Sequence, residues 1–555
     1  MLFPPFQGQV FHRGAVGDDR QAYLDHAYQY ATTSQPPGTM EPRFIVFVAG
    51  DDDIRMAIRY AADAGIAVAV RSGGHQYLGY SSTCGDNIQI DLSGVLADPA
   101  TYPYNTFDYD PSTGVLRMGV GMILRDINAR MRAAGLFVPH GECSHVRLGG
   151  HAQTGGYGLI ANQFGLLADH ITAFDIVLAD GQKRTVNRDS TDPDDRELFF
   201  AVIGGSAGTI GVLTHVSCRP FRDADYAESR GMKLMYPYSK PLLEALLRHM
   251  VAQSDEGSLP SEYSWSIMAM GSQWTLFDSS FDEVMKERHP ELYGEDTEAK
   301  LPIPGIAVVA CWANAGGKPF GDEARRFFQG IRDAAASAPF PTGALCVPAR
   351  CAGPDGDEVR FTEERPFPIS WMLGQWQWND VREFPLPFRK RLWLTAARDL
   401  GERDFAAWAA ARVHALEADP LNGCKIAAQF MALGGRDSAF NRPPDDRTST
   451  PWRDSTFFAA LDAFYDPDRF GDAARACAYG WCDQNQEEGV GPGGRFSTED
   501  RRLIWAPFGD PSLDAAHALY FSAEVYQRLL AAKRRFDPGH VFTPNAFGVG
   551  ASGKQ

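Results

Sequence analysis

The chain has 555 residues, 44% of them hydrophobic and 22% charged, a composition that excludes a disordered or fibrous protein. The chain is longer than the chains that usually fold around a single hydrophobic core, so we expect two or more lobes. The 53 Lys and Arg against 70 Asp and Glu give a net charge of −17, which argues against binding to nucleic acid or to anionic membranes, since both require a basic surface.

The first 220 residues or so predict short helices alternating with strands. Acidic residues begin the segment 51–64, and apolar side chains follow at helical spacing until Gly65 ends the helix. A second helix is expected over 122–134, with Ile123, Ile127 and Met131 on one face. Apolar runs next to glycine turns predict strands within 66–71, 87–94 and 114–121.

From about residue 221 to 504 the elements are longer. Apolar runs predict strands, within 264–270, 306–313 and 425–435. Amphipathic patterns predict helices, over 242–253 and 322–337. These elements together predict an antiparallel sheet with helices on one face, an α+β arrangement.

Turn-forming residues and a final helix complete the chain. Polar segments rich in Pro and Gly, 436–455 and 488–500, are expected to be loops. One strong helix is expected over 513–536, where Asp537-Pro538-Gly539 ends it.

The nine cysteines do not form a dense disulfide framework. Cys346 with Cys351, and Cys477 with Cys482, are close enough in sequence to pair, but scattered reduced thiols are the favoured interpretation. The N-terminal segment MLFPPFQGQVFHRG lacks a basic stretch followed by an apolar run, and no run approaches 18 apolar residues. We therefore expect a cytoplasmic protein without a membrane span; the oligomeric state is left open.

The first informative motif is the segment Arg71-Ser72-Gly73-Gly74-His75-Gln76-Tyr77-Leu78-Gly79. A strand runs into paired glycines, whose backbone turns tightly and directs N–H groups at an anion. This pattern, with an arginine beside it, predicts a pyrophosphate site. It differs from the G-x-G-x-x-G dinucleotide motif in spacing, and by itself a Gly-Gly-His turn is usually no more than a turn.

The second motif covers residues 141–158, GECSHVRLGGHAQTGGYG. Five glycines within 149–158 indicate a backbone pressed against something large. A metal site was the alternative, with His140, Cys143, His145 and His151 as ligands. Their spacing matches no common zinc pattern, so we expect no metal.

Together the two motifs resemble those of the berberine bridge enzyme-like oxidases, within the vanillyl-alcohol oxidase/p-cresol methylhydroxylase flavoprotein superfamily. The resemblance extends over nearly the whole chain. It includes Met40–Arg43, RSGGH (71–75), GECSHVRLGGH (141–151), Gly165–His170, ADG (179–181), Glu197–Gly205, TIGVLT (209–214) and KRRFDPGHVF (533–542).

The resemblance implies an α+β protein with two lobes. The expected divisions are a PCMH-type FAD-binding domain over 1–220, a substrate-binding domain over 221–504 with a large antiparallel sheet covered by helices, and a C-terminal segment over 505–555 that returns to the FAD domain. It also implies two covalent flavin bonds, from His75 to the 8α-methyl and from Cys143 to C6.

Further contacts with FAD are implied for a larger set of residues. The implied set is Arg71, Ser72, Gly73, Gly74, His75, Gln76, Gly79, Gly141, Cys143, Val146, Gly149, Gly150, His151, Gly155, Gly156, Gly158, Ile210, Gly211 and Val212. Val146, three residues after Cys143, is expected to flank the oxygen-reactive face and to leave room for O2. A core residue without a gating role is the alternative for Val146.

The catalytic base is where this chain departs from the family. Members often carry Tyr-x-Asn-Tyr-x-Asp before the last helix, but the matching stretch here is Trp505-Ala506-Pro507-Phe508-Gly509-Asp510. Neither Trp505 nor Phe508 can act as a base. Tyr77 is the first candidate to replace the missing tyrosine, followed by Tyr479 and Asp483.

The segment 371–378, WMLGQWQW, is a further candidate feature. As a strand it would place Trp376 and Trp378 on one face, either stacked on a substrate ring in the cleft or, more often, packed in the core.

The resemblance implies an oxidase that transfers a hydride from a bulky alcohol, such as an oligosaccharide, a phenolic or a secondary metabolite, to flavin N5, with O2 as acceptor and H2O2 as product. The alternatives are a dehydrogenase with another electron acceptor, a non-redox cyclase, and a ligand-binding protein on the same fold.

Overall fold

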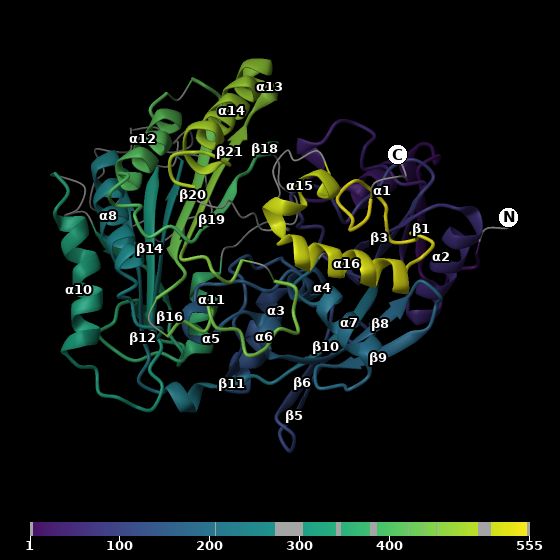
Figure 1. Ribbon diagram of the computed structural model, residues 1–555, viewed down its shortest axis with the longest axis horizontal. Helices are drawn as coiled ribbons and strands as arrows, with labels where there is room; N and C mark the ends of the chain where they lie inside the picture. Colours follow the sequence, from purple (N-terminus) through teal and green to yellow (C-terminus); the bar gives the residue numbers. More distant parts are fainter. Residues whose placement is uncertain are drawn as a thin grey trace.

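The computed structural model describes residues 4–205, 207–271, 304–339, 346–377, 386–419, 421–435, 437–450, 452–497 and 512–551. The helices and strands divide between two groups of sheets, at the right and left of Figure 1. The N-terminal elements and the end of the chain lie on the right, and the elements from β12 to α14 lie on the left.

The first sheet of the N-terminal lobe has the strand order β1-β2-β4-β3. β2 (Phe44–Phe47), β4 (Ile88–Asp91) and β3 (Val68–Arg71) are parallel, and β1 (Gln9–His12) joins antiparallel to β2. Helix α1 (Asp18–Ala27) packs on β1 and β2, and α2 (Asp51–Ala64) packs on β3 and β4. Gly65, at φ 66°, ends α2 as the sequence predicts.

The second sheet is antiparallel, in the order β5-β6-β10-β8-β9. Its strands are β5 (Phe107–Asp110), β6 (Val115–Gly119), β10 (Gly211–Cys218), β8 (Ile171–Leu178) and β9 (Lys183–Asn187). The associated helices are α3 (Leu124–Ala133), α4 (Leu148–Gln153), α5 (Ala161–Phe164), α6 (Leu167–His170) and α7 (Pro193–Val202). β7 (Leu136–Phe137) pairs with β11 (Phe221–Arg222) nearby.

The large sheet on the left is antiparallel, in the order β15-β12-β14-β13-β20-β21-β18, with β19 also on β21. Its strands are β12 (Arg230–Pro237), β13 (Tyr263–Met270), β14 (Gly305–Trp312), β15 (Val347–Pro348), β18 (Phe388–Arg389), β19 (Leu392–Thr395), β20 (Cys424–Ala432) and β21 (Phe457–Tyr465). β16 (Arg350–Ala352) and β17 (Glu358–Arg360) form a small hairpin beside it.

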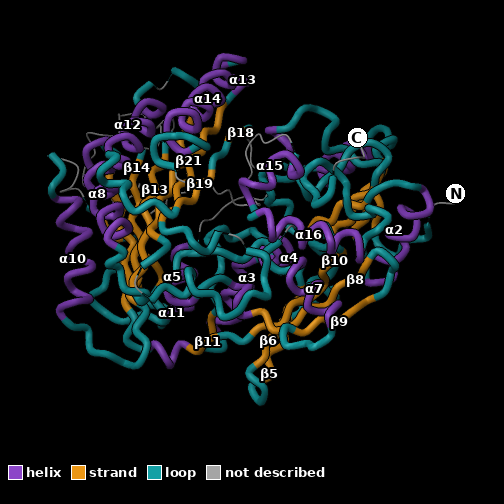
Figure 2. The backbone as a smooth tube through the Cα atoms, in the orientation of Figure 1, coloured by secondary structure: helices purple, strands orange, loops and turns teal. Residues whose placement is uncertain are grey.

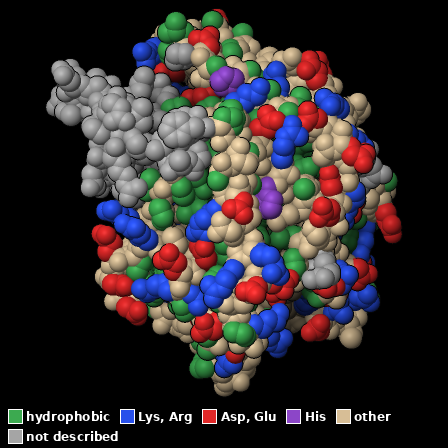
Figure 3. Space-filling model, turned by 90° about the vertical axis from the view of Figure 1, so that its left-hand side faces the viewer, with side chains coloured by type: hydrophobic (Ala, Val, Ile, Leu, Met, Phe, Trp, Pro, Cys, Tyr) green, Lys and Arg blue, Asp and Glu red, His purple; other side chains and the backbone are tan. Residues whose placement is uncertain are grey.

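Helices cover one face of this sheet, as the sequence predicts (Figure 1). They are α8 (Lys240–Glu256), α10 (Asp322–Ala336), α12 (Phe405–Glu417), α13 (Pro467–Phe470) and α14 (Asp472–Asn485). Figure 2 shows the strands of this sheet, in orange, side by side and flanked by these helices, in purple. The outer surface of this side mixes acidic and basic side chains rather than gathering one sign of charge (Figure 3).

Side-chain alternation separates the two faces of the large sheet. On β13, Trp265 and Ile267 pack in the core shared with the helices, whereas Met268 packs in the core shared with the N-terminal lobe. On β20, Phe430 faces the helices and Met431 faces the N-terminal lobe. Because side chains alternate along a strand, Gln429 shares the face of Met431. The sheet thus presents Gln429 toward the N-terminal lobe.

The end of the chain returns to the N-terminal lobe, where α16 crosses it (yellow in Figure 1). The expectation of one helix over 513–536 is wrong, because two helices form: α15 (Leu513–Tyr520) and α16 (Ala523–Phe536). Phe521 is extended, and the Ser522 hydroxyl accepts a hydrogen bond from the N–H of Val525, so a new helix begins there.

The strand expected over the tryptophan-rich segment 371–378 is also wrong. Residues Ile369–Trp376 form helix α11 rather than a strand. Trp371 and Trp376 are buried and pack against Phe361 and Phe367, so they belong to the core. Trp378 lies outside the described residues, as do Trp505, Phe508 and Asp510.

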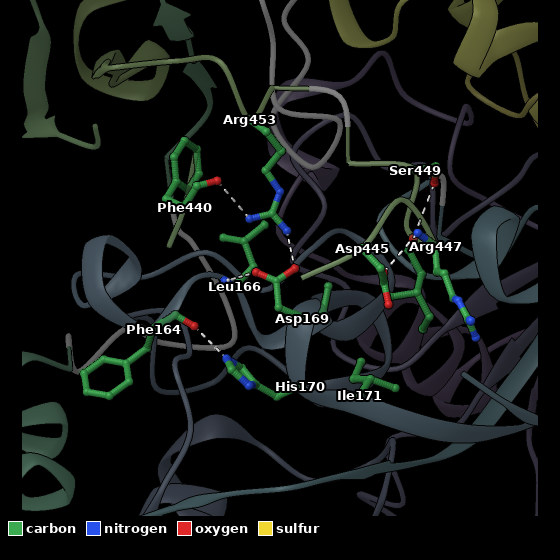
Figure 4. A network of polar contacts seen from close by, with 12 residues as sticks. Phe164, Leu166, Asp169, His170, Ile171, Phe440, Asp445, Arg447, Ser449 and Arg453 are labelled. Atoms are coloured by element: carbon green, nitrogen blue, oxygen red, sulfur yellow. Dashed lines mark hydrogen bonds and ion pairs between the residues drawn. The ribbon is translucent and has the colours of Figure 1, made fainter. Parts of the chain in front are cut away.

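The loop between β20 and β21 is fixed to the N-terminal lobe by ion pairs, and Figure 4 shows the one between Arg453 and Asp169. Arg453 lies between the carboxylate of Asp169 and the carbonyl of Phe440. Arg188 makes two hydrogen bonds of 2.7 Å to the carboxylate of Asp445. Since β20 carries Gln429, these contacts help to fix the position of Gln429 relative to the N-terminal lobe.

We expect Asp445→Asn to lower the free energy of unfolding by about 1–3 kcal/mol at neutral pH, since it weakens charged hydrogen bonds to the buried Arg188. Burial raises the pKa of Asp445, but the hydrogen bonds from Arg188 outweigh this and hold it below the ordinary aspartate value. The stabilisation is therefore present at neutral pH and lost as the pH falls through that lowered pKa. Urea unfolding at several pH values measures it. The exposed neighbour Asp446 provides the control, Asp446→Asn, and equal stability of the two variants at neutral pH would contradict the prediction.

Candidate functional site

A cavity with an empty volume of about 1320 Å³ lies where both predicted motifs meet β20. Residues from the first motif, from residues 141–158 and from β20 line it together. Of the candidate site residues that the sequence analysis names, the lining includes Ser72, Gly73, Gly74, His75, Gln76, Tyr77, Gly141, Cys143, Val146, Gly149, Gly150, His151, Gly156 and Gly158.

The first motif follows directly from the end of β3. Gly74 has φ 67°, and a Cβ there would lie 3.0 Å from the Cβ of Gln29, so the turn favours glycine on both counts. Arg71 is turned away from the cavity lining. Its guanidinium donates to Asp91 at 2.7 Å and to the carbonyls of His26 and Tyr28.

The glycines of the second motif allow close packing between backbones. A Cβ on Gly158 would lie 1.9 Å from the carbonyl oxygen of His140, and one on Gly149 would lie 2.8 Å from the Oγ of Ser72. A Cβ on Gly150 would meet no atom within 4 Å, although Gly150 lines the cavity. The motif therefore leaves open space against bare backbone, which fits a large planar cofactor.

His75 and Cys143 reach the same cavity from the two different motifs. The ring of His75 stacks on Tyr30, with centroids 5.0 Å apart and an interplanar angle of 29°. Cys143 is a half-buried thiol. Cys346, Cys351, Cys477 and Cys482, the candidates for disulfides, are also thiols.

Two histidines belong to this region: His140 is buried just before the second motif, and His151 is part of the motif and lines the cavity. Burial, with a smaller contribution from His140, lowers the pKa of His151 to about 3, so His151 is neutral. Its Nε2 accepts a 3.0 Å hydrogen bond from the N–H of Gly141. Burial likewise lowers the pKa of His140. Within the described ranges no three His, Cys, Asp or Glu side chains are grouped so as to hold a metal ion.

Glu142, which the sequence analysis did not select, also lines the cavity. The amide Nε2 of Gln429 lies 3.1 Å from a carboxylate oxygen of Glu142 and 3.4 Å from the Oγ of Ser266. Tyr157, also in the lining, has its hydroxyl 3.1 Å from the sulfur of Met431. The position of Glu142 inside the G-x-C motif, next to Cys143, was the available signal.

The candidate bases are divided between this cavity and a second one of about 1360 Å³. Tyr77 lines both cavities, and the ammonium of Lys390 lies 4.2 Å from the centre of its ring. Tyr479 lines only the second, under the guanidinium of Arg389. Asp483 accepts a 2.8 Å hydrogen bond from Arg389 and lines neither.

The remaining candidates lie outside the cavity lining. Gly79, at φ 79°, packs against Met40, and Gly155 packs against Leu166 and Trp452. Ile210, Gly211 and Val212 are buried at the start of β10. Their contribution to cofactor binding stays a prediction.

Comparison with known proteins finds an FAD binding domain in the N-terminal part of the chain. Residues 42–187 match the family model of the FAD binding domain. The chain is 33% identical over 276 residues to the FAD-linked oxidoreductase sorD of Penicillium rubens, covering 49% of this chain and 54% of that protein. It is 29% identical over 197 residues to the aclacinomycin-N/aclacinomycin-A oxidase of Streptomyces galilaeus, covering 34% of each. The matches thus span about half or less of these relatives.

Solved structures share the fold over nearly the whole chain. Berberine bridge enzyme-like 1 of Physcomitrella patens has a TM-score of 0.67 at 16% identity, covering 98% of this chain and 97% of that one. Aclacinomycin oxidoreductase has a TM-score of 0.67 at 19% identity, covering 98% and 99%.

The FAD binding domain and the fold define the class, an α+β flavoprotein with a PCMH-type architecture. More particularly, the resemblance to the berberine bridge enzyme-like proteins is confirmed. Among the described residues no helix has the length and apolar character needed to cross a membrane.

Proposed function

We propose that this chain is an FAD-dependent oxidase whose flavin is attached to both His75 and Cys143. The observation that carries the proposal is that these two side chains, from separate glycine-rich motifs, line one cavity. Two attachments hold a cofactor firmly in a site that is open to bulky substrates. The division into domains over 1–220, 221–504 and 505–555 is part of the proposal.

Bound FAD would supply hydride acceptance at N5 and reoxidation by O2 to give H2O2. The residues that would hold it are those of the two motifs that line the cavity, among them the bare backbone at Gly150, and Gln429 of the large sheet lines the same cavity. The proposed substrate is a bulky alcohol: an oligosaccharide, a phenolic or a secondary metabolite. Relatives named for aclacinomycin and chitooligosaccharide oxidation support this class.

The test is anaerobic mixing of the holoprotein with a panel of such alcohols, followed by admission of air. The proposal expects at least one alcohol to bleach the flavin absorbance, and air to restore it rapidly with one equivalent of H2O2. Reduction followed by slow reoxidation would instead identify a dehydrogenase. Turnover at constant flavin absorbance without peroxide would identify a non-redox reaction and overturn the oxidase proposal.

Val146 supplies a separate prediction about oxygen. Its half-buried side chain lines the cavity close to Cys143. Val146→Leu adds bulk where O2 is proposed to approach, so we expect flavin reoxidation to slow about tenfold, or ~1.4 kcal/mol on the barrier. Stopped-flow reoxidation measures this, with anaerobic reduction as the internal control. Unchanged reoxidation would favour a packing role for Val146.

A further inference from the structure

The proposed reaction requires a group that removes the hydroxyl proton of the substrate. Among the described residues that line the cavity, Glu142 is the one carboxylate. It lies between Gly141 and Cys143, directly beside the proposed point of flavin attachment. A carboxylate within reach of a substrate hydroxyl is a competent general base.

The large sheet holds this carboxylate in place. Gln429 of β20 donates from its Nε2 to an oxygen of Glu142 over 3.1 Å. The other face of β20 is buried against helices, and the loop after β20 is anchored by Arg188 and Arg453. The orientation of Glu142 is therefore fixed from the lobe opposite its own.

Tyr157 is a poor competitor for the role of base. Burial, and secondly the charge of Glu142, raise its pKa well above the ordinary tyrosine value. The hydroxyl of Tyr157 therefore keeps its proton, which it directs at the sulfur of Met431. Tyr157 is suited to donate a hydrogen bond rather than to accept a proton.

The other titratable and charged groups of the lining are less suited. His151 is neutral but already accepts from Gly141 through Nε2, and Arg147 donates to the carbonyl of Gly121. The ring of Tyr77 faces the ammonium of Lys390. The titratable and charged members of the lining are His75, Tyr77, Tyr80, Glu142, Cys143, Arg147, His151 and Tyr157, and β20 contributes the uncharged Gln429.

We propose that Glu142 is the catalytic base of this site, in place of the tyrosine that the family often carries. This inference rests on the proposed function. The O–H bond of the substrate breaks, and its proton moves to Glu142. The carbon that carries this hydroxyl gives up a hydride to the flavin, and a C=O bond forms between that carbon and the oxygen. The two electrons and two protons that the substrate loses then reduce O2 to H2O2, which restores the carboxylate.

The test compares Glu142→Gln with wild type, using an alcohol that reduces the wild-type flavin in the panel. We expect anaerobic reduction to slow about 10²–10³-fold at neutral pH, since proton removal by a positioned base contributes roughly this much. In the wild-type protein, the rate at which the alcohol reduces the flavin should fall at low pH, because a protonated carboxyl cannot take up the proton. The variant should lack this dependence on pH.

The midpoint potential of the flavin gives a readout that does not depend on turnover. Removing a negative charge beside the flavin favours its reduction, so Glu142→Gln should raise the potential while slowing the reaction. A disturbed site without loss of a base would not combine these two changes. Glu262→Gln is the matched control, because Glu262 pairs with Trp312 and Lys318 away from this cavity.

The outcomes separate the inference from the function on which it rests. If no alcohol reduces the wild-type flavin, the proposed function itself fails. If wild type is reduced and Glu142→Gln is reduced equally fast with the same pH profile, Glu142 is not the base although the oxidase proposal stands. Should Glu142→Gln bind no flavin, Glu142→Ala is measured in its place, and reduction as fast as wild type's would overturn the inference.

Discussion

Replacing His75 and Cys143 together by alanine is expected to free the flavin from the denatured protein completely. Each single replacement should leave one covalent bond, because the two side chains reach the cavity from separate motifs. The measurement is the flavin absorbance of acid-precipitated protein, compared between pellet and supernatant. We expect a yellow pellet for wild type and both single variants, and a colourless pellet for the double variant.

Cys84 provides the matched control for the cysteine replacement. It is an exposed thiol outside the cavity lining, so Cys84→Ala should keep both attachments. A yellow pellet from the double variant would mean that another side chain carries the flavin. A colourless pellet from His75→Ala alone would mean that Cys143 forms no bond.

A large loss of stability is expected for Asp537→Ala at the end of α16. The ammonium of Lys533 donates to Asp537 at 2.5 Å and to the carbonyl oxygens of Thr209 and Phe542, at 2.6 and 3.0 Å. Asp537 also accepts from the N–H groups of Val541 and Phe542. Both side chains are almost completely buried, so removing one partner strands a charge and should cost about 3–5 kcal/mol.

Denaturant unfolding of Asp537→Ala measures this cost, with the exposed Glu402→Ala as the control. The contacts tie α16 to Thr209, just before β10, and the Val541 carbonyl accepts from the N–H of Val68 in β3. The variant should therefore also unfold at a lower temperature than wild type. A loss below about 1 kcal/mol, the size expected for an exposed pair, would contradict the argument.

The sequence pointed to the two glycine-rich segments that line one cavity, because the signals of these segments are local. The glycines at 73–74 and 149–158 are needed where backbones approach, and that need is visible in the sequence itself. The helical spacing of apolar residues within 242–253 and 322–337 likewise predicted the helices on one face of the large sheet. His75 and Cys143 fall within these motifs, so their presence at one cavity could be anticipated.

What the sequence did not predict depends on contacts between distant segments. Glu142 gains its orientation from Gln429, on a strand of the other lobe. The expected strand at 371–378 is wrong because a helix buries Trp371 and Trp376 against Phe361 and Phe367. The break at Ser522 was not predicted because apolar residues continue on both sides of it, and the cap hydrogen bond from Val525 to the Ser522 hydroxyl is visible only in the structure.

The central claim is that one flavin is bonded to two side chains of this chain. Proteolysis of the denatured, unmodified holoprotein followed by mass spectrometry tests it most directly. We expect a single species in which the peptide containing His75 and the peptide containing Cys143 are joined through one FAD. Recovery of all the flavin free in solution, with both peptides at their unmodified masses, would contradict it.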